Sequence, residues 1–298
     1  MWNSRPSTRT DREAGPVLDV QMSWWGMSGL GTEGEDSAEA RFRRIAEAGF
    51  DGINGFVPAP EEAGRWRRLL DEYSLTFSVN AYPRTAADMA EFLRAAKEFG
   101  RVEYVNAQVM TPFVTGAAAE RLLRDIAELS REAGIPVYVE THRGTITQDL
   151  LRTIDYAERI EELRLTIDYS HYVVAGELHT IGDEAEALLQ RLLPRTSSIH
   201  ARVSNGEQVQ VNLSDDGEHP MLPHFKRWWR DGMRHWLGSA RSGERFPFVC
   251  ELGPPSYAIT ADEQGARTKE LGDRWKQSLQ LANIARGLWS EAAAAGRG

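Results

Sequence analysis

Four segments of the chain place a side chain that can bind a metal at the end of an apolar or β-branched run. Glu140 ends "PVYVE", Asp168 ends "LRLTID", His200 lies in "SSIHAR", and Glu251 lies in "PFVCEL". Three carboxylates are costly to bury side by side unless a cation compensates their charge. If the fold brings the four segments together, they predict a site for one divalent metal ion. Mn²⁺, Mg²⁺, Co²⁺ and Zn²⁺ all suit three carboxylates and one imidazole.

The rest of the sequence predicts how these segments are positioned. Short apolar runs alternate with amphipathic stretches, as in βαβ units around a parallel sheet. The helical stretches 37–49, 85–100 and 116–134 each end in glycine, which is typical of a helix C-cap. Eight strands are expected, at residues 17–24, 51–57, 76–82, 102–109, 136–140, 163–168, 197–202 and 247–252.

Eight strands, each followed by a helix, predict an α/β fold of the (β/α)8 TIM barrel type. A doubly wound sheet usually has fewer strands and a G-x-G-x-x-G turn after the first, which "SWWGMSGLGTEG" does not supply. Loops after the strands of a barrel form its catalytic face, where the four segments would meet. We expect residues 17–298 to form a single barrel domain and residues 1–16 a flexible N-terminal arm. The long interval 204–222 predicts a loop with lid or substrate contacts.

Composition narrows the classes of partner. Of the 298 residues, 35 are basic and 44 are acidic, and the net charge of −9 opposes binding to a nucleic-acid backbone. No apolar run is long enough to cross a bilayer, and no apolar region of a signal peptide follows the basic N-terminus, so a cytoplasmic protein with no membrane partner is expected. Cys250 is the only cysteine, which excludes an intrachain disulfide and a cysteine-rich metal site.

The motifs "AEAGFDGI", "YVETHRG", "IDYSH", "IHAR" and "CELG" resemble the xylose-isomerase-like TIM barrel superfamily. This superfamily includes sugar isomerases, tagatose epimerases, inosose dehydratases and endonuclease IV. The resemblance implies that Glu140, Asp168, His200 and Glu251 bind the metal. It also implies that His171 binds substrate, as in the tagatose-epimerase branch, and that the protein forms a homodimer or homotetramer. That branch has a Glu and an Arg after the seventh strand, where this chain has "HARVSNGEQ".

Proton transfer beside a polarised carbonyl is the chemistry that this set of residues indicates. Glu140 and Glu251 are expected to flank a sugar or polyol, one removing a proton and the other returning it, while the cation stabilises the enediolate. Return to the opposite face would give epimerisation, and return to the adjacent carbon would give isomerisation. Loss of a β-hydroxyl would instead make the protein a lyase or dehydratase of a keto-sugar or inosose. An endonuclease IV-like phosphodiesterase is disfavoured, because it would need more metal ligands and a basic groove.

His142 lies two residues beyond Glu140, so a continuing strand would point both side chains to the same side. There His142 would act as a general acid or base, or would orient Glu140. Arg202 and Arg143 are candidates for binding an anionic or polyhydroxy substrate. Salt bridges that hold loops are an equally good explanation of both arginines.

Two tryptophan pairs differ in their expected roles. Trp25 directly follows the first strand, so it is expected to form a wall of the substrate pocket. The pair at 228–229 lies in a helix-like stretch and is expected to pack in the core. No phosphate-binding motif is present, so the sequence does not indicate a phosphorylated substrate.

Overall fold

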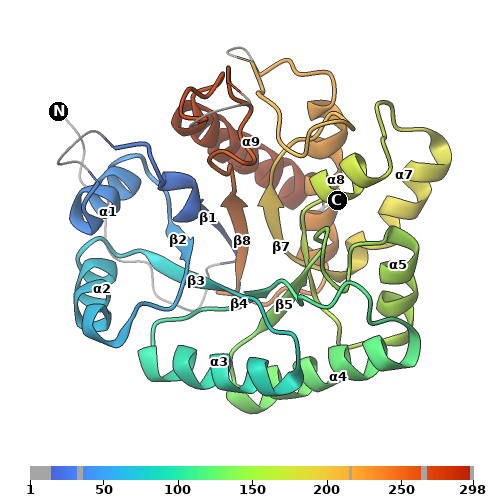
Figure 1. The fold of residues 1–298 in the computed structure, drawn as a ribbon, viewed down its shortest axis with the longest axis horizontal. Helices are drawn as coiled ribbons and strands as arrows, with labels where there is room; N and C mark the ends of the chain where they lie inside the picture. The colour runs from blue at the N-terminus through green and yellow to red at the C-terminus, as the bar shows by residue number, and fades with distance from the viewer. Residues whose placement is uncertain (1–14, 32–35, 215–216, 263–266, 296–298) are drawn as a thin grey trace.

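In the computed structural model, eight parallel strands close into a barrel, and β8 pairs back to β1 (Figure 1). The structure describes residues 15–31, 36–214, 217–262 and 267–295. The expected N-terminal arm therefore lies almost entirely outside the described residues. The predicted (β/α)8 barrel is confirmed. Its strands are β1 (Val17–Ser23), β2 (Gly52–Gly55), β3 (Thr76–Ala81), β4 (Val105–Ala107), β5 (Val137–Glu140), β6 (Leu165–Ile167), β7 (Thr196–Ala201) and β8 (Arg245–Cys250).

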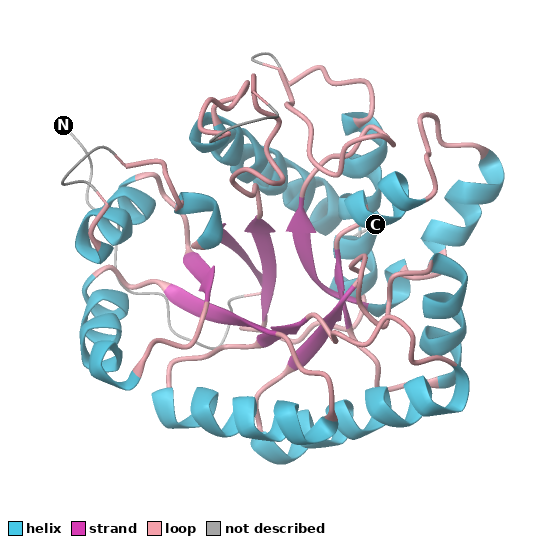
Figure 2. Cartoon of the chain, in the orientation of Figure 1, coloured by secondary structure: helices cyan, strands magenta, loops and turns pink. Residues whose placement is uncertain are grey.

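Helices form an outer layer around the strands (Figure 2). Within the described residues they are α1 (Ala38–Glu47), α2 (Pro60–Glu72), α3 (Ala86–Phe99), α4 (Gly116–Ala133), α5 (Leu150–Arg159), α6 (Ser170–Ala175), α7 (Asp183–Gln190), α8 (Leu222–Leu237) and α9 (Arg274–Ala295), with short 3-10 turns η1 (Trp25–Met27) and η2 (Leu193–Arg195). Two of the three expected glycine C-caps are present, since Gly100 and Gly134 adopt left-handed backbone at φ 77° and 72°. The C-cap of α1 is Ala48, and Gly49 follows it at φ 80°.

The strands alternate between two environments, as β3 illustrates. Phe77 faces outward, where its ring contacts the rings of Trp66 in α2 and Phe99 in α3. The intervening residues Ser78 and Asn80 face inward and hydrogen-bond to side chains of other strands. The main apolar core therefore lies between the barrel and its helices, whereas part of the barrel interior is polar.

Strand five ends at the residue that the sequence predicted. The last residue of β5 is Glu140, so the predicted end at residue 140 is confirmed and the strand does not continue to His142. The hydroxyl of Thr147 donates to the carbonyl of Glu140 at 2.5 Å and accepts from the backbone N–H of His142 at 3.2 Å. These bonds turn the chain away from the sheet and replace the strand pairing. His142 therefore begins a loop.

The long interval between β7 and β8 forms a loop at the carboxyl end of the strands, as expected. Gln210 in this loop accepts a hydrogen bond from the backbone N–H of Gly253 at 2.7 Å and donates to the Gly253 carbonyl at 2.9 Å. The loop is thus fastened to the segment that follows β8. Among the described helices, none is both long enough and apolar enough to span a bilayer.

Candidate metal centre and active site

The four candidate ligands lie at the carboxyl ends of β5 to β8. Glu140 ends β5, His200 lies in β7, and Asp168 and Glu251 directly follow β6 and β8. All four are buried, with at most 4% of their surface exposed. The Nδ1 atom of His200 lies 3.6 Å from Oε1 of Glu140 and 3.3 Å from Oε2 of Glu251. Glu140, His200 and Glu251 offer ligand atoms that all lie within 4.8 Å of one another.

Asp168 joins this group from one side. Its Oδ1 accepts hydrogen bonds from the backbone N–H of Ser170 at 3.0 Å and from the Ser170 hydroxyl at 2.5 Å. Its Oδ2 lies 3.5 Å from Nε2 of His171 and 3.4 Å from Nη2 of Arg202. Ser170 thus orients the carboxylate so that Oδ2 faces the other candidate residues.

Arg202 is a buried cation within the same group. Its Nε donates to the backbone carbonyl of Glu251 at 3.1 Å, and its Nη2 forms an ion pair with the Glu251 carboxylate. Its guanidinium also lies over the ring of Tyr257, 4.6 Å from the centroid. Its Nη1 has no hydrogen-bond partner among the described residues, so one donor is free for another acceptor.

The second oxygen of Glu140 has partners that sequence reasoning missed. Its Oε2 accepts hydrogen bonds from Nδ2 of Asn106 at 2.5 Å and from Nε2 of Gln108 at 3.0 Å. Both residues come from the fourth predicted strand, "VEYVNAQV", where polar residues stand at alternate positions in an otherwise apolar run. That alternation was the available signal, because a strand places such residues on one face.

Two imidazoles lie beside the carboxylates. The rings of His142 and His171 are 3.8 Å apart between centroids. Nδ1 of His142 lies 2.5 Å from the carbonyl oxygen of Arg143, and its Nε2 lies 3.3 Å from the hydroxyl of Tyr257. His171 is fully buried, and neither of its ring nitrogens has a hydrogen-bond partner among the described residues. Glu140, His142 and His171 form a second set of ligand atoms within 4.8 Å.

Aromatic rings form one side of the site. The ring of Trp25 lies 5.1 Å from that of Tyr257, edge to face. A Cβ atom at Gly253 would fall only 2.1 Å from the Trp25 ring, so a glycine is needed for this approach. Tyr257 was not found from the sequence, because it lies in an irregular segment with no periodic pattern. Trp24 points elsewhere and packs on Phe42 and Trp66.

The pKa values within the site diverge strongly. Burial opposes the charge of Glu140, but His200 outweighs it and holds the pKa of Glu140 below its usual range. Burial likewise opposes the charge of His200, yet Glu251 and Glu140 raise its pKa to about 10. Burial raises the pKa of Asp168 to about 7, with Arg202 acting in the opposite direction. Burial also lowers the pKa of both His142 and His171, which favours neutral imidazoles.

These residues fit a divalent metal ion. The Oε1 of Glu140, the Oδ2 of Asp168 and both ring nitrogens of His200 are buried, and within the described residues they have no hydrogen-bond partner. Buried polar atoms are normally satisfied, so this cluster of unpartnered polar atoms fits a bound cation. Carboxylate oxygens and a neutral imidazole are suitable ligands for one.

A family model for the xylose isomerase-like TIM barrel matches residues 42–221. This chain belongs to the xylose isomerase-like TIM barrel family. No curated protein matches the sequence. The family match does not by itself give an activity.

Solved structures share the fold of this xylose isomerase-like chain at low identity. A xylose isomerase-like protein from Mycobacterium smegmatis in complex with magnesium is 16% identical, with a TM-score of 0.57 over 95% of this chain and 99% of that one. A D-allulose 3-epimerase from Methylomonas sp. in complex with D-allulose is 15% identical, with a TM-score of 0.56 over 94% and 98%. The probable 3-DHS dehydratase AsbF from Bacillus anthracis is 12% identical, with a TM-score of 0.55 over 90% and 99%.

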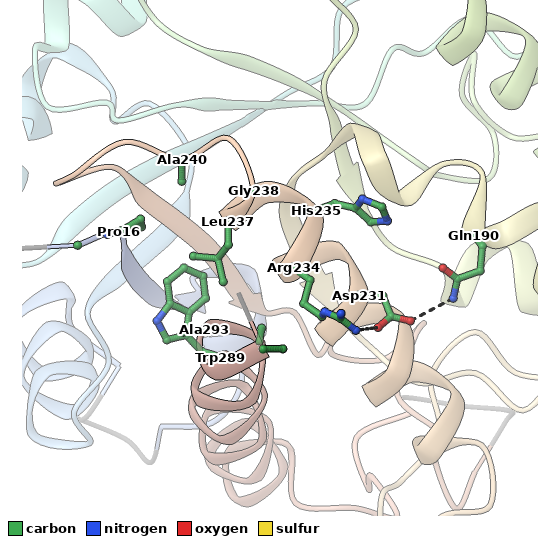
Figure 3. A pocket seen from close by; sticks show the side chains of 13 residues that line it. Pro16, Gln190, Asp231, Arg234, His235, Leu237, Gly238, Ala240, Trp289 and Ala293 are labelled. Carbon is green, nitrogen blue, oxygen red and sulfur yellow. Dashed lines mark hydrogen bonds and ion pairs between the residues drawn. The ribbon is translucent and has the colours of Figure 1, made fainter. Parts of the chain in front are cut away.

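A groove lies apart from the candidate metal ligands, at the opposite end of the barrel. A groove of about 1010 Å³ lies where α8 and α9 meet the segment before β1, at the amino end of the strands (Figure 3). Its Asp231 accepts a hydrogen bond from Gln190 at 3.3 Å and lies 4.0 Å from Arg234. These polar groups satisfy one another, and no candidate ligand lines the groove. The groove and the candidate ligands are therefore separate features of the barrel.

Proposed function

We propose that the protein is a divalent-metal-dependent isomerase or epimerase that acts on a sugar, keto-sugar or polyol by proton transfer. The observation that carries this proposal is the convergence of Glu140 and Glu251, from the non-adjacent strands β5 and β8, on His200 between them. Two buried carboxylates on different sides of one small site can remove and return a proton at one carbon. The epimerase among the structural neighbours supports the same reading.

Glu140, Asp168, His200 and Glu251 would hold the ion. When bound, Mn²⁺, Mg²⁺, Co²⁺ or Zn²⁺ would act as a Lewis acid toward the carbonyl and hydroxyl oxygens of the substrate. The four proposed ligands come from successive strands of a closed sheet. The sheet would therefore hold their side chains in place before the ion binds.

Glu140 and Glu251 form the proposed acid and base pair. Hydrogen bonds from Asn106 and Gln108 hold Oε2 of Glu140, so Oε1 faces His200 and the substrate. On the other side, Arg202 holds Oε2 of Glu251. One carboxylate would take the proton from the carbon next to the carbonyl, and the other would return it. Delivery to the opposite face gives an epimer, and delivery to the neighbouring carbon gives an isomer.

His171, Arg202 and Trp25 are the proposed substrate-binding residues. The unpartnered ring nitrogens of His171 and the free Nη1 of Arg202 would bind hydroxyl or carboxylate oxygens of the substrate. The ring of Trp25 would contact the carbon skeleton. His142 would supply an additional acid or base, because its Nε2 faces the hydroxyl of Tyr257 beside the site.

A lyase or dehydratase is the second candidate, and the paired imidazoles favour it. Elimination of a hydroxyl group needs an acid for the leaving oxygen in addition to the base that removes the proton. His142 and His171 lie close together beside Glu140, so one of these neutral imidazoles would remove the proton and, once protonated, would serve as that acid. The two candidates differ in one measurable way, since elimination of water reduces the mass of the substrate by 18 Da and epimerisation conserves it.

The test is hydrogen exchange in deuterated buffer with Mn²⁺ and a panel of keto-sugars and polyols. We expect deuterium at one substrate carbon, detected by NMR, only when the metal is present. Glu140→Gln and Glu251→Gln should abolish it, while Glu98→Gln at an exposed helical position should not. Exchange that persists in either site variant would defeat the proposal. A dehydrated product in the mass spectrum would favour the lyase.

A further inference from the structure

An unbroken series of side-chain hydrogen bonds crosses the barrel interior from Asp19 in β1 to Glu140 in β5. Its members come from β1 to β5 and are at most 5% exposed. From one end to the other, the bonds are Gln21 Nε2 to Asp19 Oδ2 at 2.7 Å, Ser78 Oγ to Gln21 Oε1 at 2.5 Å, Asn54 Nδ2 to Ser78 Oγ at 3.0 Å, Asn80 Nδ2 to Asn54 Oδ1 at 2.9 Å, Asn106 Nδ2 to Asn80 Oδ1 at 3.0 Å, and Asn106 Nδ2 to Glu140 Oε2 at 2.5 Å.

The series has a direction. From Asn106 onward, each residue donates to the next one toward Asp19. Asn106 uses both hydrogens of its amide, one for Asn80 and one for Glu140. An ionised carboxylate can only accept hydrogen bonds, so Asp19 at one end and Glu140 at the other both require donors facing them. These two ends fix the orientation of every amide between them.

Reversing any amide in the series would be costly. A flipped Asn80, for example, would turn its own N–H toward the N–H of Asn106 and leave buried groups without partners. An unsatisfied buried polar group costs about 1–3 kcal/mol, so the whole series favours one arrangement. Branched aliphatic side chains usually fill this part of a barrel and would be simpler to pack. A polar series here therefore calls for a reason beyond packing.

We propose that Asn106 is a positioning residue for Glu140, and that Asp19 sets the orientation of Asn106 through the amides between them. This inference rests on the proposed function only in giving Glu140 its role as metal ligand and proton carrier. The N–H of Asn106 holds Oε2 and leaves Oε1 directed at His200. With a reversed or missing amide, the carboxylate would be free to rotate away from the position that the ligand set requires.

The first experiment measures Mn²⁺ affinity by calorimetry on the full-length protein. Residues that orient metal ligands typically change metal affinity by about 10–100-fold when substituted. We expect Asn106→Ala to weaken binding by about tenfold or more, and Asp19→Asn to weaken it by about threefold. Thr166→Val is the matched control, because Thr166 is buried in the barrel interior and its hydroxyl has no hydrogen-bond partner. Its affinity should equal that of the wild type.

A double-variant cycle tests the remote part of the inference. If Asp19 acts through Asn106, the Asp19→Asn substitution should cause no further loss in the Asn106→Ala background. Additive losses would overturn the role of Asp19, and an unchanged affinity of Asn106→Ala would overturn the positioning role. Asn106→Ser, which keeps a donor on a shorter side chain, replaces the alanine variant if that one does not fold.

Crystal structures of the metal-free variants separate this inference from the proposed function. We expect the Glu140 carboxylate to be rotated or disordered in Asn106→Ala and unchanged in Thr166→Val. A Glu140 side chain that stays in place without Asn106 would overturn the inference whether or not the protein binds metal. A wild type that binds no Mn²⁺ would defeat the proposed function, and the crystal structures alone would then decide the role of Asn106.

Discussion

Arg202 and Glu251 are joined twice, once through the backbone and once through the side chain. Nε of Arg202 donates to the Glu251 carbonyl at 3.1 Å, and Nη2 pairs with its carboxylate. The same Nη2 lies 3.4 Å from Oδ2 of Asp168. The guanidinium would thus compete with the proposed metal ion for two of its four proposed ligands.

Replacing Arg202 should therefore strengthen metal binding. Arg202→Gln removes a buried positive charge beside Asp168 and Glu251, and we expect Mn²⁺ affinity to rise by about tenfold, or ~1.4 kcal/mol. Calorimetric titration of the variant measures this. Arg143→Gln is the control, since Arg143 is exposed and contacts the ring of Tyr257 rather than a candidate ligand. Equal or weaker Mn²⁺ binding by Arg202→Gln would show that the guanidinium supports the ion instead of competing with it.

The metal-free protein should lose stability as the pH rises. The pKa of His200 is about 10 in the folded state and about 6.5 in the unfolded state. Because the folded pKa is raised, its stabilising contribution is complete below pH 6.5 and is lost as the pH rises through 10. Urea unfolding at pH 6, 8 and 10 with a chelator present measures this loss. His200→Gln should flatten the dependence, and the same slope in both proteins would contradict the assignment.

The ionisation of Asp19 should also lower the stability of the protein as the pH rises, but in a lower pH range than His200. Burial raises its pKa from 3.8 to about 6, although Gln21 and Thr76 donate hydrogen bonds to it. The associated stability is complete below pH 3.8 and is lost as the pH rises through 6. Asp19→Asn should therefore gain stability relative to wild type between pH 4 and 7, by at most about 3 kcal/mol. Urea unfolding at pH 4 and at pH 7 tests this, and Asp125→Asn at an exposed position is the control.

The sequence was sufficient to predict the barrel, because each strand and helix carries its own hydrophobic period. It also indicated the four candidate ligands, since the carboxyl ends of strands in a barrel necessarily meet. The hydrogen-bond series from Asp19 to Glu140 could not be predicted in the same way. It depends on the register between strands, which places Asn80 opposite Asn106 and Ser78 opposite Asn54. No local pattern in the sequence encodes that register.

Loops account for the other differences. The sequence predicted the end of β5 at Glu140 but left the position of His142 open, which the hydroxyl of Thr147 decides by bonding the backbone and starting a loop there. The long distance in sequence between Arg202 and Tyr257 hid their contact. Both cases involve an irregular segment that is fixed by a few specific side-chain contacts, and such contacts leave no periodic signal.

The close approach of Trp25 to Gly253 gives a prediction about the position of the Trp25 ring. Gly253→Ala would place a Cβ atom 2.1 Å from the Trp25 ring, and Gln210 holds the backbone of residue 253 on both sides. The ring must therefore shift, which alters its edge-to-face contact with Tyr257. We expect a loss of near-ultraviolet circular dichroism that matches the loss in Trp25→Phe, with Mn²⁺ affinity within about twofold of wild type.

The control for this variant is Gly64→Ala in α2, where a new Cβ atom would meet nothing within 4 Å. That substitution should leave the near-ultraviolet spectrum unchanged and add about 0.8–1 kcal/mol of stability through helix propensity. If Gly253→Ala keeps the wild-type spectrum, the backbone after β8 has shifted to relieve the clash and the Trp25 ring has not. In that case Trp25 would be a fixed part of the pocket wall, and the position of Glu251 should change, which a large fall in Mn²⁺ affinity would reveal.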